Sequence, residues 1–284
     1  MITSFTPDAL AGAQRQIPPV AQVLADLQRL LGDTETALED IARLIKVDPA
    51  LAARVVQISN SAHFRRGALN ETIFDAVNRI GFREVYHVVA VVGSAAIVSQ
   101  PVLTYRRDAA AMWRDSLACA LGAEMLADST GEDAVACYLS GLLHAIGRLA
   151  INQHLVAHAA ENERIRQLAD DGFPRDFSGD EFALLGFTQA DVAAAMIARW
   201  KFAPTVVEAV RAQYEPLSAE EPHDRAAAVL YCARLLRSAV CDGQDVRAVT
   251  VDPDVLHLIG LTLDQVADYV PSVAAALAKA QSMA

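Results

Sequence analysis

One apolar stretch decides the fold: Tyr138-Leu-Ser-Gly-Leu-Leu-His-Ala-Ile-Gly-Arg-Leu-Ala-Ile151. Its leucines and isoleucines recur at spacings of three and four, the period of a helix with a wide apolar face, and no charged residue precedes Arg148. We therefore expect a buried core helix with His144 at its middle. Taken alone, this histidine is explained equally well by a hydrogen bond to a backbone carbonyl in the core and by a functional role.

The composition indicates a globular, all-α protein. The chain has 284 residues, of which 53% are hydrophobic and 21% are charged, so it can bury a large core. Alternating apolar and polar runs of the strand type are almost absent, which favours helices throughout. The N-terminus lacks the pattern of a secretion signal, and the apolar run at 85–98 is too short to span a membrane. We therefore expect a cytoplasmic protein without a membrane segment.

The charge distribution disfavours broad binding of nucleic acid. The net charge is −11, and residues 106–284 hold 15 basic against 25 acidic side chains. Such an acidic field repels a phosphate backbone. One alternative stays open, because the expected helix pair at 37–60 has the form of a helix-turn-helix and predicts a DNA-binding regulator. Its second helix offers Arg54, Gln57 and Ser59 as groups to contact bases.

Two segments carry a resemblance to known families. Gly141-Leu-Leu-His-Ala-Ile-Gly-Arg-Leu149 resembles the helix with the His-Asp pair of HD-type metal-dependent phosphohydrolases, with Ala145 in place of the aspartate. The segments Ile45-Lys-Val-Asp-Pro-Ala-Leu-Ala-Ala-Arg-Val-Val-Gln-Ile-Ser-Asn-Ser-Ala62 and Ile73-Phe-Asp-Ala-Val-Asn-Arg-Ile-Gly-Phe82 resemble the HDOD family, the HD-related output domain of bacterial signalling proteins. This resemblance covers roughly residues 17–217 and implies a two-lobed helical, HD-domain-like (HDOD) bundle.

The expected organisation follows from this resemblance and from the chain's breaks. Residues 1–16 are predicted to be an N-terminal tail, and residues 17–105 an N-terminal helical lobe. Residues 106–217 form the HD-like helical lobe, and residues 218–284 supply C-terminal helices packed on that lobe. The boundary between the lobes is expected near 100–108, where Pro101 and a polar stretch interrupt the helices.

The resemblance also indicates where an HD enzyme would place its metal ligands. In such an enzyme an imidazole and carboxylates hold a metal that activates water. The corresponding positions here are Asp115, His144, Ala145, Gln189, Gln213 and Tyr214. A methyl group binds no metal and neutral amides are poor ligands, while Asp115 is expected to be exposed or paired with Arg114 or Arg148.

We therefore predict no catalytic residue, no bound metal and no cofactor. What remains is a vestigial site, defined as Asp115, His144, Arg148, Gln189 and Gln213. The function that follows is a non-catalytic signal-transduction adaptor that binds a protein partner, without membrane association. The alternative is a degenerate phosphohydrolase or a nucleotide-binding pocket, in which Arg114, Arg148, Gln189 and Gln213 donate to phosphate. The sequence specifies neither the partner nor the oligomeric state.

A candidate partner contact lies in the polar loop at 61–72. A loop between buried helices runs over the surface, and this one holds Phe64 beside Arg65 and Arg66. Aromatic and arginine side chains are typical anchors of protein interfaces. The alternative is that Phe64 and Leu69 fold back onto the N-terminal lobe and the arginines are solvated.

Overall fold

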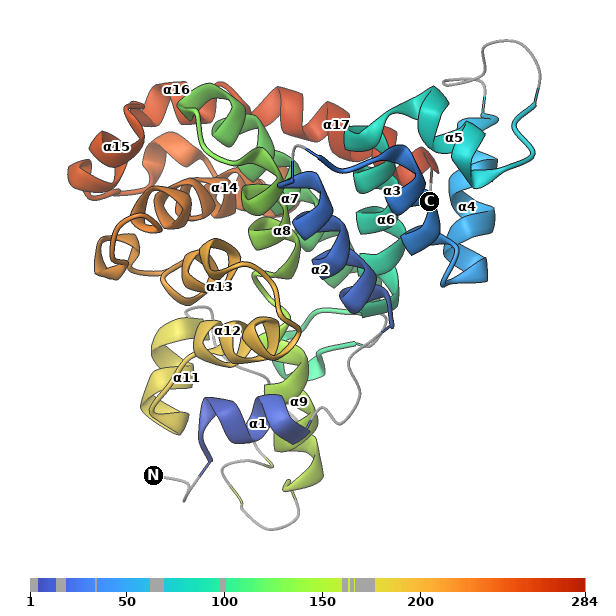
Figure 1. Ribbon diagram of the computed structural model, residues 1–284. Coiled ribbons are helices and arrows are strands. Elements are labelled where there is room, and N and C mark those ends of the chain that lie inside the picture. Colours follow the sequence, from blue (N-terminus) through green and yellow to red (C-terminus); the bar gives the residue numbers. More distant parts are fainter. Residues whose placement is uncertain are drawn as a thin grey trace. The chain divides into compact units, whose positions relative to one another are not determined.

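The computed structural model describes residues 5–13, 19–33, 35–61, 69–97, 101–159, 163, 166 and 177–283. Within these ranges every regular element is a helix, and the one extended pairing is an isolated antiparallel bridge between Val102 and Arg107. The predicted all-α fold is therefore confirmed (Figure 1).

The chain divides into two compact units. One contains residues 1–16 and 98–278, and the other contains residues 17–97 and 279–284. The N-terminal segment that we predicted as a tail contains a helix, Pro7–Ala13. The sequence analysis missed it because a seven-residue helix has too few turns to show a period. Its Leu10 and Ala11 are buried, so this helix is part of the larger unit's core.

The smaller unit is a bundle of five helices in the described residues. They are α2 (Pro19–Leu31), α3 (Leu38–Ile45), α4 (Pro49–Ser59), α5 (Ile73–Ile80) and α6 (Phe82–Ile97). Helix α6 packs against α2 and α4, and α5 packs against α3 and α4. The core comes from the apolar faces of these helices, including Leu27, Ile41, Val55 and Val77, all of which are fully buried.

Helix α4 ends next to a residue that ties it to the following segment. Asn60 does not adopt a left-handed conformation, because among the described residues only Arg106 and Lys201 have a positive φ without being glycine. The Asn60 side chain instead bonds Asn70 across the loop, with Nδ2 2.9 Å from the Asn70 oxygen and Oδ1 2.7 Å from its nitrogen. Asn70 Nδ2 donates to Ser59 Oγ over 3.0 Å. Ser59 is fully buried, so it cannot contact DNA bases as the helix-turn-helix alternative requires.

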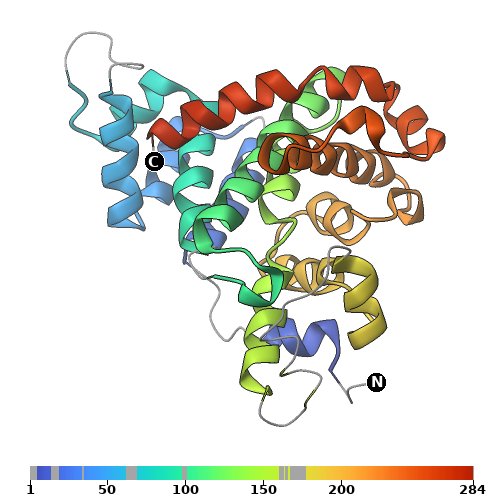
Figure 2. The same ribbon diagram turned by 180° about the vertical axis from the view of Figure 1, so that it is seen from behind.

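The larger unit holds the remaining helices. They are α1 (Pro7–Ala13), η1 (Leu103–Tyr105), α7 (Ala109–Thr130), α8 (Ala134–Leu143), α9 (Gly147–Ala157), α11 (Phe177–Leu185), α12 (Gln189–Arg199), α13 (Pro204–Arg211), η2 (Pro216–Ser218), α14 (Asp224–Asp242), η3 (Val246–Ala248), α15 (Pro253–Ile259), α16 (Leu263–Ala267) and α17 (Val270–Met283), the last of which ends in the smaller unit. Helix α7 lies between α8 and α14 (Figure 2), and α12 packs on α13, α9 and α1.

The apolar stretch that decides the fold is not one helix. Helix α8 ends at Leu143 and α9 begins at Gly147, with a turn between them. Residues 134–157 together are long and apolar enough to cross a membrane, but 89% of the most apolar 18-residue window in this stretch is buried inside the protein, as expected for core helices. The apolar period continues through both halves, so the sequence did not reveal the break.

Two glycines set how closely these helices approach their neighbours. A Cβ on Gly141 would lie 2.6 Å from the Ala120 Cα, so α8 touches the α7 backbone there. A Cβ on Gly147 would lie 2.0 Å from the Gln189 backbone oxygen, so α9 touches the first turn of α12. The turn at His144 is therefore held between α7 and α12, which carry Asp115 and Gln189 of the vestigial site.

Candidate functional site

The backbone oxygen of His144 is the centre of the vestigial site. In a continuous helix the Arg148 N–H would bond this oxygen, but at the break it bonds the Ala145 oxygen over 3.2 Å. Two glutamine side chains take the place of the Arg148 N–H group as donors to the His144 oxygen. Gln189 Nε2 donates to the His144 oxygen over 3.0 Å and Gln213 Nε2 donates over 2.9 Å. Both glutamines are fully buried, so the amides satisfy a carbonyl that the break would otherwise leave bare.

Each of these amides has a second acceptor. Gln189 Nε2 also lies 3.0 Å from the Tyr214 hydroxyl, and Gln213 Nε2 lies 2.9 Å from the Val210 oxygen. Both N–H groups of each amide are thus in use. The two Oε1 atoms are buried without a hydrogen-bond partner among the described residues. The structure therefore brings Gln189, Gln213 and Tyr214 together around His144, at the positions that the family resemblance indicated.

The His144 ring is a neutral core group. It is 3% exposed, and its Nδ1 lies 2.7 Å from the Gly141 oxygen, which makes Nδ1 the protonated nitrogen. Burial, together with the nearby Arg148 guanidinium, holds the pKa of His144 well below its ordinary value. This is the core-histidine account, in which the ring bonds a backbone carbonyl.

This burial makes stability depend on pH in a defined direction. The unfolded chain protonates the histidine below about pH 6.5, whereas the folded protein keeps it neutral. The free energy of unfolding should therefore fall as pH drops through that value, by up to about 1.4 kcal/mol per pH unit. We expect urea titrations at pH 7.5 and 5.5 to show this loss, and His144→Gln to reduce it.

Two comparisons isolate the contribution of His144. Burial raises the pKa of Glu181, which gives a slope of opposite sign, so the quantity to compare is the difference between the wild type and His144→Gln. The matched control is His257→Gln on an exposed face of α15. If the free energy of unfolding changed equally with pH in the wild type and in His144→Gln, the His144 ring would have the same pKa in the folded and the unfolded protein.

Asp115 does not lie where the sequence analysis expected. It is 2% exposed, and its Oδ2 lies 3.4 Å from Arg107 Nε and 3.8 Å from Arg237 Nη1. The same two guanidinium groups bond Asp242, at 2.7 and 2.6 Å. The predicted exposure of Asp115 and its pairing with Arg114 or Arg148 are wrong. Helix α14 covers this face of α7, which buries the aspartate and supplies Arg237.

A tight turn brings Arg107 to this aspartate. Arg106 has a left-handed backbone, with φ of 54°, and ends η1. The turn lets the Val102 N–H bond the Arg107 oxygen over 2.9 Å. Sequence reasoning treated the stretch at 105–108 only as a boundary between lobes. No local sequence pattern indicates that Arg107 pairs with Asp115.

A second buried acid, Glu181, adjoins the glutamines. It accepts the Tyr105 hydroxyl and the Gln189 backbone N–H, each over 2.7 Å. Glu181 lies inside α11, which begins at Phe177, and its side chain is fully buried. Arg148 Cζ lies 5.4 Å from the Tyr105 ring centroid. Tyr105 and Glu181 are 76 positions apart, and no local sequence pattern indicates that they form a pair.

These residues do not fit the metal centre of an HD enzyme. Ala145 supplies no ligand, both glutamines direct their N–H groups to a backbone oxygen, and Asp115 is neutralised by two arginines. In the part of the chain that the structure describes, no three histidine, cysteine, aspartate or glutamate side chains are grouped as metal ligands. The donor chemistry is that of an internal hydrogen-bond network.

The candidate partner contact at Phe64, Arg65 and Arg66 lies outside the described residues. The loop's C-terminal end is described, and there Leu69 is 60% exposed. Leu69 therefore does not fold back onto the helices, as the alternative interpretation required.

Comparisons with known proteins place this site in a family. The HDOD domain family matches residues 17–216. A protein of Treponema pallidum (strain Nichols), described only as uncharacterized, is 26% identical over 197 residues, which cover 69% of this chain and 37% of the relative. The chain thus matches little more than a third of that relative's length.

Solved structures share the fold. The crystal structure of a candidate phosphohydrolase from Shewanella amazonensis SB2B superposes with a TM-score of 0.69 at 25% identity, covering 97% of this chain and 98% of the other. That of a candidate signal transduction protein from Marinobacter aquaeolei VT8 superposes with a TM-score of 0.70 at 23% identity, covering 100% of this chain and 61% of the other. The family match spans most of the sequence and includes the vestigial site, and we conclude that this chain belongs to the HDOD family.

Proposed function

We propose that this protein is a non-catalytic signal-transduction adaptor whose output is the binding of another protein. The observation that carries the proposal is the paired donation of Gln189 and Gln213 to the His144 backbone oxygen. Two positions that would bind metal in an HD enzyme stabilise a helix break instead. The amide N–H groups of both glutamines are used within this network, which holds the helix break together while surface residues provide the function.

The nucleotide-binding alternative loses two of its four donors in this arrangement. It requires Gln189 and Gln213, beside Arg114 and Arg148, to donate to a phosphate, but the N–H groups of both glutamines are already used within the protein. Of the neighbouring arginines, Arg234 donates to the Gln213 oxygen over 2.6 Å, and Arg237 bonds Asp242. A phosphate would have to displace these bonds and approach the buried Asp115 and Glu181.

Hydrolysis assays test the enzymatic alternative. We expect the purified full chain, supplied with Mn²⁺ or Mg²⁺, to cleave neither bis-(p-nitrophenyl) phosphate nor a cyclic dinucleotide faster than His144→Gln does. Turnover by the wild type that His144→Gln abolishes would overturn the non-catalytic assignment. Melting curves of both proteins serve as the folding control.

Partner capture tests the adaptor role. We expect cross-linking in the native cell, followed by purification of the tagged chain, to recover a defined protein in stoichiometric yield. His144→Gln should recover it equally, because the ring bonds only the protein's own backbone in this account. Absence of any stoichiometric partner under conditions in which the chain is folded would contradict the adaptor role.

A further inference from the structure

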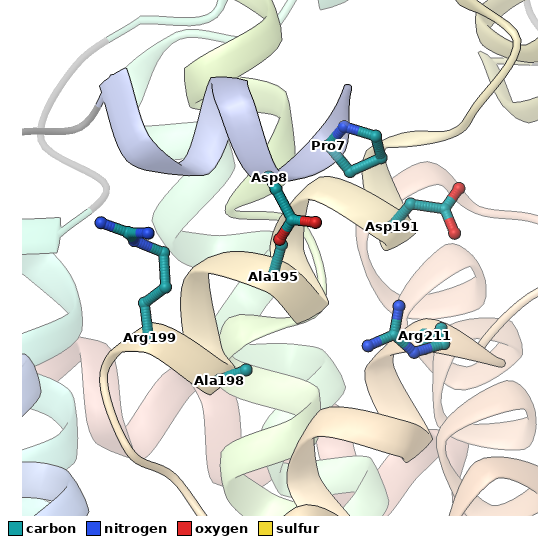
Figure 3. Close-up of a pocket in the computed structure, with 7 residues that line it drawn as sticks. All are labelled: Pro7, Asp8, Asp191, Ala195, Ala198, Arg199 and Arg211. Atoms are coloured by element: carbon teal, nitrogen blue, oxygen red, sulfur yellow. The ribbon is translucent and has the colours of Figure 1, made fainter. Parts of the chain in front are cut away.

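A cavity lies beneath α1, between that helix, α12 and α13, and none of the residues that line it belongs to the vestigial site. Its volume is about 460 Å³, and it is lined by Pro7, Asp8, Asp191, Ala195, Ala198, Arg199 and Arg211. This volume is within the range of small-molecule pockets. Figure 3 shows Asp8 extending from α1 toward Ala195, with Arg199 and Arg211 on opposite sides.

The spacing along α12 explains the arrangement of the lining. Asp191, Ala195, Ala198 and Arg199 are related by steps of three and four residues, so they share one face of the helix. Over eight residues that face is about 12 Å long. The methyl groups of Ala195 and Ala198 form an apolar surface at the base of the cavity, the alanine floor. Asp191 lies at one end of this surface and Arg199 at the other. Asp8 and Pro7 from α1 close the side opposite this floor.

Two of the four charged groups have partners within the protein. The Asp191 carboxylate accepts the backbone N–H of Thr188 over 2.8 Å and its hydroxyl over 3.0 Å. Arg211 Nε bonds Glu208 over 3.2 Å. For Asp8 and Arg199, no ion pair or hydrogen bond of the side chain is found among the described residues. One acid and one base thus face the same cavity without neutralising each other.

We propose that this cavity binds a small amphoteric molecule of the α-amino-acid type. Arg199 would receive the carboxylate, and Asp8 would receive the ammonium group. A simple anion would meet the carboxylates of Asp8 and Asp191, and a simple cation would meet two guanidinium groups. A ligand that carries both charges pairs each with its opposite, and its side chain covers the alanine floor.

The proposal makes α1 part of a ligand site. Because Asp8 belongs to α1, a molecule that bridges Asp8 and Arg199 would bind α1 more firmly to α12. Ligand binding should therefore raise the melting temperature of the full chain by mass action. This site is independent of the proposed adaptor role, because it shares none of the residues at the helix break.

Calorimetric titration of the full chain with individual free L-amino acids tests the proposal. Each amino acid is compared with the matching amine that lacks the carboxylate and the matching acid that lacks the ammonium group. We expect at least one amino acid to bind and both single-charge analogues to bind at least tenfold more weakly. Asp8→Asn and Arg199→Gln should each weaken binding about tenfold, equivalent to about 1.4 kcal/mol.

The control is Arg43→Gln, an exposed arginine in the smaller unit that pairs with Asp40. It should bind the amino acid as the wild type does. Because Asp8 and Arg199 are exposed, their variants should melt at the wild-type temperature without ligand. The proposal is overturned if no amino acid binds at tens of millimolar. It is also overturned if the acid analogue binds as well as the amino acid and Asp8→Asn has no effect, since that result describes an anion site.

Discussion

Gly147→Ala should lower the free energy of unfolding by more than about 3 kcal/mol, or prevent the chain from accumulating in folded form. The new methyl carbon would lie 2.0 Å from the Gln189 backbone oxygen and 2.8 Å from the Ala193 backbone nitrogen. Backbone atoms of a packed helix cannot move aside as a side-chain tip can. The helices α9 and α12 would have to separate, which would also pull Gln189 away from the His144 oxygen. Urea denaturation followed by circular dichroism measures the effect.

Gly122→Ala in α7 is the matched control. There the nearest atom to the new Cβ is the Leu236 Cδ1, 3.3 Å away, at the end of a flexible side chain. Alanine is also favoured over glycine in a helix by about 1 kcal/mol, so the net change should be small. Similar stabilities for the two variants would mean that α9 and α12 are not in backbone contact at Gly147.

Replacing both glutamines with methionine should cost about 1–3 kcal/mol more than the sum of the single replacements. Each single variant leaves the His144 oxygen one amide donor, and it also removes a buried Oε1 that has no partner among the described residues. The single changes should therefore be mild. The double variant leaves the buried His144 carbonyl without either amide donor. The extra loss of stability comes from this unsatisfied carbonyl.

A double-mutant cycle measures this coupling. The required proteins are the wild type, Gln189→Met, Gln213→Met and the double variant, each unfolded in urea. Additive costs would show that the glutamines act separately and that the His144 oxygen is not their shared acceptor. Retention of near-native circular dichroism in all four proteins is the condition for interpreting the cycle.

The sequence alone predicted the all-α fold. It also predicted which residues of this chain stand at the metal-ligand positions of HD enzymes. Both the helical periods and the HDOD resemblance can be recognised in short stretches of the sequence, without knowing which helices pack together. They place His144, Gln189 and Gln213 in one site without any knowledge of distances. What they could not give was the break at 144–146, because the apolar period continues across it and the cause lies in Gly147 meeting α12.

The charged neighbours of the site were predicted less well, for a related reason. Asp115 was expected to be exposed or paired with Arg114 or Arg148, as a lone aspartate on a helix usually is, but α14 covers it and supplies Arg237. The partners of a buried acid come from elements distant in sequence, and a single sequence does not indicate which helix will cover which face. Glu181 and Tyr105 escaped notice for the same reason.

The metal content of the purified protein tests the central claim most directly. The full chain and His144→Gln are to be prepared with Mn, Fe and Zn in the growth medium, and the bound metal is to be measured after dialysis. We expect both proteins to contain only substoichiometric metal and not to differ, because Ala145 supplies no ligand and the neutral amides of Gln189 and Gln213, whose N–H groups hold the His144 oxygen, are poor metal ligands. One equivalent or more of metal in the wild type, lost in a folded His144→Gln variant, would contradict the claim.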